Sequence, residues 1–267
     1  MIRTGSRCMN AIRGLVVLAI LLISTSSHAA ASATTVADQI IGQLVKKFAS
    51  LETLSFTVKR VTTNKNHKTE EKWRFRYRRP NSIRIDYFVP SERLVLVNDD
   101  SLYEYIPATR SLSQIHLKKL PPFEKSQLIN KVLAPVAVPG LTIENAADLH
   151  NNPVQVSQVM FDGHNAIRME YSDPKHIIYI DPAQTSLLRA EIFDSEEHLI
   201  LRTSAKQFTE IFAGFWIPRE IQVIYGAREG GATKSVIYLS DYMANHELPA
   251  SLFLPPTIPN IKAKELN

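Results

Sequence analysis

Apolar and polar residues alternate along most of the chain, a pattern typical of strands that bury one face. The clearest example lies between Glu70 and Arg79, where Trp73, Phe75 and Tyr77 share one face. The opposite face of that segment carries four cations, Lys72, Arg74, Arg76 and Arg78. An apolar face backed by a charged face predicts an antiparallel strand with one side in water, because parallel strands are usually buried on both sides.

The same period of two predicts about eleven to thirteen strands, most of them neighbours in sequence. We expect them near residues 54–64, 70–79, 83–87, 93–97, 102–106, 111–117, 154–161, 166–171, 176–180, 186–194, 197–208, 219–226 and 234–241. A meandering antiparallel sheet of this size must curl in order to bury its apolar face. The pattern therefore favours a mainly β domain of the α+β class, built as an unclosed antiparallel half-barrel.

Two segments have the spacing of a helix instead. Residues 35–38 resemble a capping box, and apolar residues then recur every three to four positions to about residue 51. That stripe includes Ile41, Leu44 and Phe48. The second segment, 121–140, is bounded by prolines and has its apolar residues at Phe123, Leu128, Ile129, Val132 and Leu133. We expect the two helices to close the mouth of the half-barrel.

The N-terminus has the three parts of a secretory signal peptide. Arg3, Arg7 and Arg13 precede an apolar run at 14–23, and small residues follow it up to residue 33. The run is about half of the ~20 residues that a membrane-spanning helix needs. The only cysteine, Cys8, lies before the run. We therefore expect residues 1–33 to be removed, and the mature chain to lack both a disulfide and a lipid-acceptor cysteine.

Charge argues against nucleic acid as a partner. Removal of residues 1–33 would leave 28 basic and 26 acidic residues, a formal charge of only +2. The remaining length suits one domain, here taken as residues 34–255 with a flexible tail at 256–267. The eight histidines have no metal-ligand spacing, and no nucleophile motif or phosphate-binding glycine loop is present. We expect neither an enzyme nor a bound cofactor or metal.

One stretch of the chain is similar to a known family. It contains Arg79-Pro80-Asn81, then Pro90, a Leu-Val strand at 94–97, and the ending Tyr103-Glu104-Tyr105-Ile106-Pro107. This order and spacing over residues 79–107 resembles the periplasmic outer-membrane lipoprotein carrier (LolA-type) family. Residues 179–182, 187–189 and 214–218 are similar to the wider lipoprotein-sorting superfamily. Asn98-Asp99 and Ile106 depart from the family, which has Asp-Gly and Asn there.

The resemblance implies an apolar cavity that receives acyl chains beneath a helical lid at 121–140. It implies a monomeric carrier in the periplasm that takes lipoproteins or lipids from an inner-membrane exporter toward an outer-membrane acceptor. Arg79 would then contact the lid. The cavity would be lined by Ile41, Leu44, Phe48, Phe56, Trp73, Phe75, Tyr77, Ile83, Ile85, Tyr87, Leu94, Leu96, Tyr103 and Tyr105.

Other interpretations stay open at the level of sequence. The same fold could serve a module that senses lipid or lipoprotein and regulates a membrane partner. A third alternative is a hydrolase acting on envelope material, and the lack of a recognisable nucleophile or acid pair argues against it. Arg79 could be a solvated charge at a strand end. The cations at residues 72, 74, 76 and 78 could be a solvated face, or a docking surface for acidic partners or anionic head groups.

Overall fold

The protein is built on one large sheet. The computed structural model describes residues 27–65, 67–98, 100–133, 153, 155–172, 175–226, 232–256 and 264–265, and all statements below concern these residues. The strands are β1 (Thr53–Asn64), β2 (His67–Arg78), β3 (Ser82–Val89), β4 (Arg93–Val97), β5 (Ser101–Ile106), β6 (Ser111–His116), β7 (Gln155–Phe161), β8 (His164–Ser172), β9 (Lys175–Asp181), β10 (Ser186–Phe193), β11 (Leu199–Phe212), β12 (Phe215–Tyr225), β13 (Thr233–Ala244) and β14 (Lys264–Glu265).

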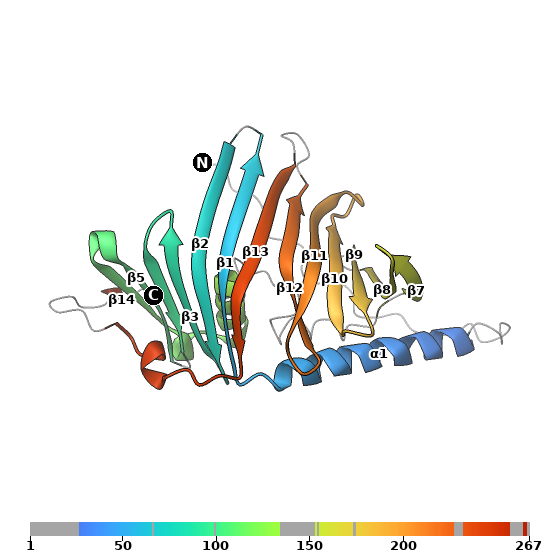
Figure 1. Ribbon diagram of the computed structural model, residues 1–267, viewed down its shortest axis with the longest axis horizontal. Coiled ribbons are helices and arrows are strands. Elements are labelled where there is room, and N and C mark those ends of the chain that lie inside the picture. The colour runs from blue at the N-terminus through green and yellow to red at the C-terminus, as the bar shows by residue number, and fades with distance from the viewer. Residues whose placement is uncertain are drawn as a thin grey trace, which may run out of the picture.

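The strand order is β14-β6-β5-β4-β3-β2-β1-β13-β12-β11-β10-β9-β8-β7. Neighbours in the sheet are mostly neighbours in sequence, and the pairing of β1 with β13 joins the two halves. Every pair is antiparallel except β14 with β6, which is parallel. The sheet curves strongly but its two edge strands, β14 and β7, do not meet (Figure 1). The expected unclosed antiparallel half-barrel is confirmed.

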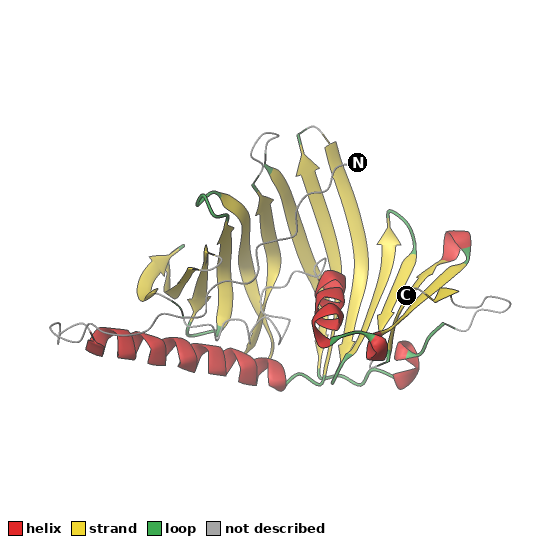
Figure 2. Ribbon diagram, turned by 180° about the vertical axis from the view of Figure 1, so that it is seen from behind, coloured by secondary structure: helices red, strands yellow, loops and turns green. Residues whose placement is uncertain are grey.

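Two α-helices accompany the sheet, α1 (Ser27–Ala49) and α2 (Pro122–Leu133). Helix α1 runs along one end of the strands, beneath the β7–β12 half, while α2 lies against the inside of the curve (Figure 2). Three short 3-10 helices occupy Pro107–Thr109, Leu117–Lys119 and Ala250–Phe253, the last of which is called η3.

Several boundaries differ from the sequence expectation. Helix α1 begins at Ser27, so residues 35–38 lie inside a helix and do not start one, and part of the expected signal peptide is helical. The rest of that peptide, residues 1–26, lies outside the described residues. Strand β12 continues through Pro218. The proline is tolerated there because β12 pairs only with β11 at this position, and its pairing with β13 begins at Glu220. Lys264 and Glu265, in the expected flexible tail, form a fourteenth strand.

The core lies on one face of the sheet and forms two clusters. The first spans β1–β5, β12 and β13, and Leu128 and Val132 of α2 pack against it. The second joins Ala37, Ile40 and Leu44 of α1 to five residues of β8 and β9. Phe48 of α1 packs against both clusters. Each helix therefore covers a different part of one continuous apolar face.

Candidate functional site: the inner face of the half-barrel

The strand register defines an inner face, which the two helices cover. Directly paired residues share a face, and the pairs Phe56–Phe75, Phe75–Ile85 and Ile85–Val95 run across four strands in one row. These side chains are almost fully buried. Of the residues that the sequence assigned to a cavity, those on the inner face of the sheet are Phe56, Trp73, Phe75, Tyr77, Ile83, Ile85 and Tyr87.

Four other residues of that set lie on the opposite, outer face. Leu94 and Leu96 pair with Asp86 and Arg84 on one side and with Tyr105 and Tyr103 on the other. This row shares a face with the charged side chains of β3, so its grouping with Ile83 and Ile85 is corrected. The sequence was ambiguous here because residues 94–97 are apolar without interruption, and such a run does not reveal which side faces inward.

Helix α1 presents its apolar stripe to the sheet, as expected from its spacing. Ile41 and Leu44 are buried, and the ring of Phe48 meets that of Phe215 edge-on with a centroid distance of 5.6 Å. The pocket beside this contact has a volume of about 20 Å³, which is room for roughly one water molecule. The end of α1 is thus packed closely against β12.

Lys47 fixes the same end of α1 by polar contacts. Its ammonium group donates to the backbone carbonyls of Gln184 at 3.1 Å, Thr185 at 3.0 Å and Trp216 at 3.4 Å. It also lies 4.9 Å from the centroid of the Phe215 ring. Burial lowers the pKa of Lys47 to about 8, against a smaller opposing effect of the Asp181 carboxylate. The chain therefore places a partly desolvated cation where helix and sheet meet.

Arg79 also contacts α1 and not the described part of the expected lid. Its guanidinium donates to the carbonyl of Ala49, the last residue of α1, and pairs with Glu52 at 3.2 Å. Asn245 forms two further hydrogen bonds with the residues that follow α1. Its side-chain amide donates to the Ser50 carbonyl at 3.2 Å, and its Oδ1 accepts from the Glu52 N–H at 2.8 Å. Among the described residues, the contacts of Arg79 thus lie at the C-terminal end of α1, and the lid contact stays a prediction because residues 134–140 lie outside the description.

Helix α2 is held differently. Leu128 and Val132 pack against the first cluster, Ile129 is half-buried, and Phe123 is 71% exposed. Among the described side chains of α2, none forms a hydrogen bond or ion pair with the sheet. The side chain of Leu133 and residues 134–140 of the expected lid lie outside the description. The described part of α2 is therefore attached through apolar contacts, in contrast to the polar anchors of α1.

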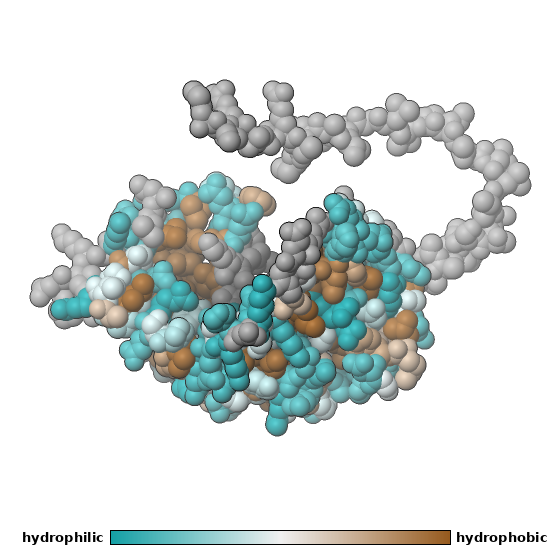
Figure 3. All heavy atoms as spheres, turned by 90° about the horizontal axis from the view of Figure 1, so that it is seen from above, coloured by the Kyte–Doolittle hydropathy of each residue, from teal (hydrophilic) through white to brown (hydrophobic). Residues whose placement is uncertain are grey.

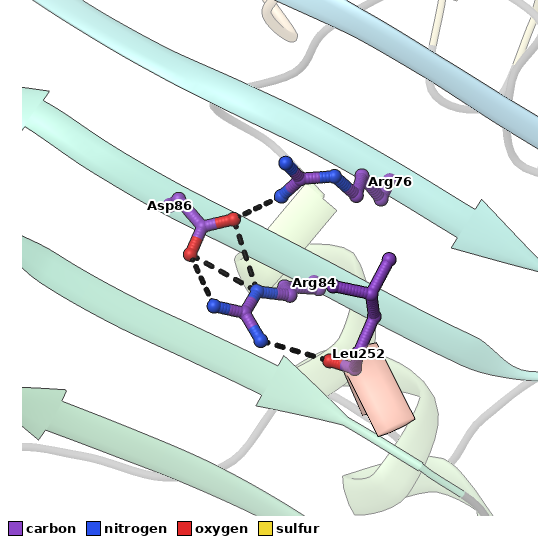
Figure 4. A network of polar contacts seen from close by, with 4 residues as sticks. All are labelled: Arg76, Arg84, Asp86 and Leu252. Carbon is purple, nitrogen blue, oxygen red and sulfur yellow. Dashed lines mark hydrogen bonds and ion pairs between the residues drawn. The ribbon is translucent and has the colours of Figure 1, made fainter. Parts of the chain in front are cut away.

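The cations of β2 are on the outer face, as the alternation predicted. The Asp86 carboxylate accepts from Arg76 and from both Nε and Nη2 of Arg84, which in turn donates from Nη1 to the Leu252 carbonyl at 2.9 Å (Figure 4). The Arg78 guanidinium lies 5.2 Å from the ring centroid of Phe253 in η3. Of the four cations of β2, Arg78 therefore contacts the C-terminal segment directly and Arg76 pairs with Asp86, while Lys72 and Arg74 are exposed.

Sequence reasoning missed Lys47, Asp86 and Asn245. Lys47 and Asn245 bind backbone groups that are distant in sequence, and Asp86 pairs with Arg76 on the neighbouring strand, so periodicity carries no sign of these contacts. Among the described residues, no group of three or more His, Cys, Asp or Glu side chains could hold a metal ion. No helix in the described ranges combines the length and apolarity needed to cross a bilayer.

Three solved structures share this arrangement of sheet and helices. A DUF1329 family protein from Desulfovibrio piger has a TM-score of 0.58 and 13% identity, over 83% of this chain and 97% of its own. A LolA superfamily protein from Nitrosomonas europaea has a TM-score of 0.52 and 13% identity, over 82% and 97%. The fold is that of the LolA superfamily.

A domain from Vibrio parahaemolyticus, described as an outer membrane lipoprotein-sorting protein, supports the same conclusion. Its TM-score is 0.53 with 13% identity, over 84% of this chain and 97% of its own. No protein-family model matches the sequence, and no curated protein matches it. The resemblance seen in residues 79–107 is therefore confirmed for the LolA-type fold, on structural similarity and not on overall sequence identity.

Proposed function

We propose that this protein is a non-enzymatic periplasmic carrier that binds the acyl chains of lipoproteins or lipids and moves them from the inner toward the outer membrane. The observation that carries the proposal is the inner face itself. A single curved sheet presents a continuous apolar surface, which two helices cover in parts and which no second sheet covers within the described residues. Apolar side chains gather in the hollow of the sheet when it is viewed from above (Figure 3).

The physical demand on such a carrier agrees with this surface. Burial of each CH₂ group of an acyl chain contributes ~0.8 kcal/mol to membrane binding. Transfer through water therefore needs a protein surface that is about as apolar as the membrane interior. Because the inner-face side chains are already buried, an acyl chain would reach them only after a covering element moves. Helix α2 is the better candidate for that movement, since its described side chains make only apolar contacts with the sheet.

Export to the periplasm belongs to the same proposal. It rests on the signal-peptide pattern of residues 1–33 and on the absence of a cysteine after the apolar run. The superfamily fold is compatible with that location. An inner-membrane exporter and an outer-membrane acceptor would be transient partners, and no chemical step is assigned to any residue.

The decisive experiment uses a matched pair on one strand. The mature protein is purified without detergent, incubated with vesicles, and its co-purifying acyl chains are quantified by mass spectrometry. Val95→Trp fills the inner face, whereas Leu94→Trp adds similar bulk one residue earlier on the outer face. We expect bound lipid in the wild type and in Leu94→Trp, and a several-fold loss in Val95→Trp. Lipid that is absent from the wild type would overturn the proposal.

A second assay tests transport itself. The purified protein is added to spheroplasts whose lipoproteins are labelled, and the release of label into the medium is measured. A carrier should release label in proportion to its concentration, and Val95→Trp should release less than Leu94→Trp. Lipid binding without any release would instead favour a sensing module on the same fold.

A further inference from the structure

Four charged side chains form a group on the inner face, at the ends of β1–β5 that point away from α1. Arg60 pairs with Glu71 at 3.4 Å, and Arg93 pairs with Glu104 at 3.1 Å. The strand register places all four on the same side as Trp73, Tyr87 and Val95. This group, Arg60, Glu71, Arg93 and Glu104, is called the charged rim.

Two aromatic rings connect the halves of the charged rim. The Arg60 guanidinium lies 5.2 Å from the ring centroid of Trp73, and the Arg93 guanidinium lies 4.1 Å from that of Tyr87. The two rings are themselves in contact, with centroids 5.7 Å apart. Burial raises the pKa of the Tyr87 phenol, while the charges of Arg93 and Arg60 oppose that rise. The two cations therefore flank one aromatic pair, each against its own ring.

The inner face consequently has three zones in a fixed order. Along β1–β4, aliphatic and Phe side chains lie nearest α1, the Trp73–Tyr87 pair follows, and the charged rim lies beyond that pair. A bilayer leaflet has the same order, since Trp and Tyr prefer the boundary between hydrocarbon and charged head groups. Three of the four rim side chains are accessible, since Arg93, Glu104 and Glu71 are 40%, 36% and 37% exposed, while Arg60 is 18% exposed.

The charges of the rim are balanced, two positive against two negative. A guanidinium matches the oxygens of a phosphate in geometry, and a carboxylate accepts hydrogen bonds from an ammonium group. An anionic head group would satisfy the arginines but leave the carboxylates facing like charge. A head group that carries both a phosphate and a primary amine satisfies both kinds of side chain.

We propose that the charged rim binds the phosphoethanolamine head group of a phospholipid whose acyl chains lie along the inner face. Arg60 and Arg93 contact the phosphate, and Glu71 and Glu104 accept from the ammonium. The inference rests on the proposed acyl-chain binding and narrows its cargo to a zwitterionic, amine-bearing phospholipid.

The test is a competition within one vesicle preparation. Phosphatidylethanolamine, phosphatidylcholine and phosphatidylglycerol with identical acyl chains are mixed in equal amounts and incubated with the mature protein. The bound lipids are then extracted and compared with the input. We expect phosphatidylethanolamine to be enriched about tenfold over phosphatidylglycerol, the size of one charge-assisted hydrogen bond. Phosphatidylcholine, which lacks N–H donors, should lie between the two.

Variants distinguish the role of the charged rim from that of the apolar inner face. Glu104→Gln should reduce the enrichment of phosphatidylethanolamine several-fold and favour phosphatidylglycerol. Arg93→Gln should reduce the bound amount of all three lipids, and Arg93→Lys should restore part of that loss. The controls are Lys59→Gln and Glu70→Gln, because Lys59 and Glu70 form a 3.0 Å ion pair on the outer face of β1 and β2, the strands that carry Arg60 and Glu71. The controls should retain the wild-type lipid composition.

The outcomes distinguish this inference from the function on which it rests. Equal uptake of the three lipids by the wild type, or an unchanged lipid composition in Glu104→Gln, would overturn the role of the rim and leave acyl-chain binding intact. Absence of all three lipids from the wild type would overturn both. Circular dichroism of each variant shows whether the sheet is retained. Arg93→Lys keeps the positive charge at position 93 and so tests the same contact with a conservative change.

Discussion

The guanidinium of Arg79 donates a hydrogen bond to the backbone carbonyl of Ala49, which is the last residue of α1. Carbonyls at the C-terminal end of a helix lack partners within the helix and attract cations. This contact therefore ties the end of α1 to the turn between β2 and β3. It gives Arg79 an anchoring role for the helix that lies along one end of the half-barrel.

Removal of this contact should loosen α1 locally. We expect Arg79→Leu to lower the free energy of unfolding by about 1 kcal/mol, the size of one solvent-accessible hydrogen bond to a charged group. Amide hydrogen exchange in the last turn of α1 should become faster. Arg219→Leu, at an exposed position on β12, is the control and should leave that exchange unchanged. Equal protection of the turn in both variants would contradict the anchoring role.

The lowered pKa of Lys47 predicts an unusual pH dependence. The pKa is about 8 in the folded protein and 10.5 in the unfolded chain, because burial disfavours the ammonium form. Above pH 8 the unfolded chain therefore binds more protons at Lys47 than the folded protein does. The contribution of Lys47 to the free energy of unfolding consequently rises with pH up to about 10.5. Below pH 8 both states are protonated, so the site adds no pH dependence.

Urea unfolding of wild type and Lys47→Met between pH 7 and pH 10 measures this effect, with pH 8 as the point of onset. The difference in unfolding free energy, wild type minus variant, should increase with pH above that point. Lys46→Met changes an exposed neighbour on the same helix and should give a difference that does not depend on pH. A flat difference for Lys47→Met would mean that the ammonium group is not desolvated.

The sequence was sufficient for the fold where one strand face is polar and the other apolar. Trp73, Phe75 and Tyr77 alternate with cations, so their inward direction follows from the period alone. It was insufficient for residues 94–97, where both faces are apolar, and for Arg79, whose partner is a backbone carbonyl thirty positions earlier. The charged rim is likewise assembled from four strands, and only their register brings Arg60 and Glu104 to one face.

The outer face gives a prediction about the C-terminal segment. Asp86 lies between Arg76 and Arg84, and Arg84 holds the carbonyl of Leu252. We expect Asp86→Asn to cost roughly 1–3 kcal/mol, since it leaves two partly buried guanidinium groups without their counter-charge. Limited proteolysis should then cut faster near η3.

Glu70→Gln is the matched control for Asp86→Asn. It removes the partner of Lys59 from an ion pair in which both side chains are nearly half exposed, at 46% and 47%. Its expected cost is within about 0.5 kcal/mol. Identical cleavage of Asp86→Asn and Glu70→Gln would show that the Asp86 network does not hold the C-terminal segment.

Helix α2 offers the most direct test of how the inner face opens. Val132 packs against the first cluster, whereas Phe123 on the same helix is 71% exposed. A carboxylate at position 132 would be buried among apolar groups when α2 is docked, so Val132→Asp should favour the undocked helix by about 1–3 kcal/mol. A dye that fluoresces on apolar surfaces should then bind more strongly, while the strand signal in circular dichroism stays constant. Phe123→Asp introduces the same charge at an exposed position and should leave dye binding at the wild-type level. Equal dye binding by the two variants would mean that α2 does not cover a ligand-accessible surface, and another element would have to move to admit an acyl chain.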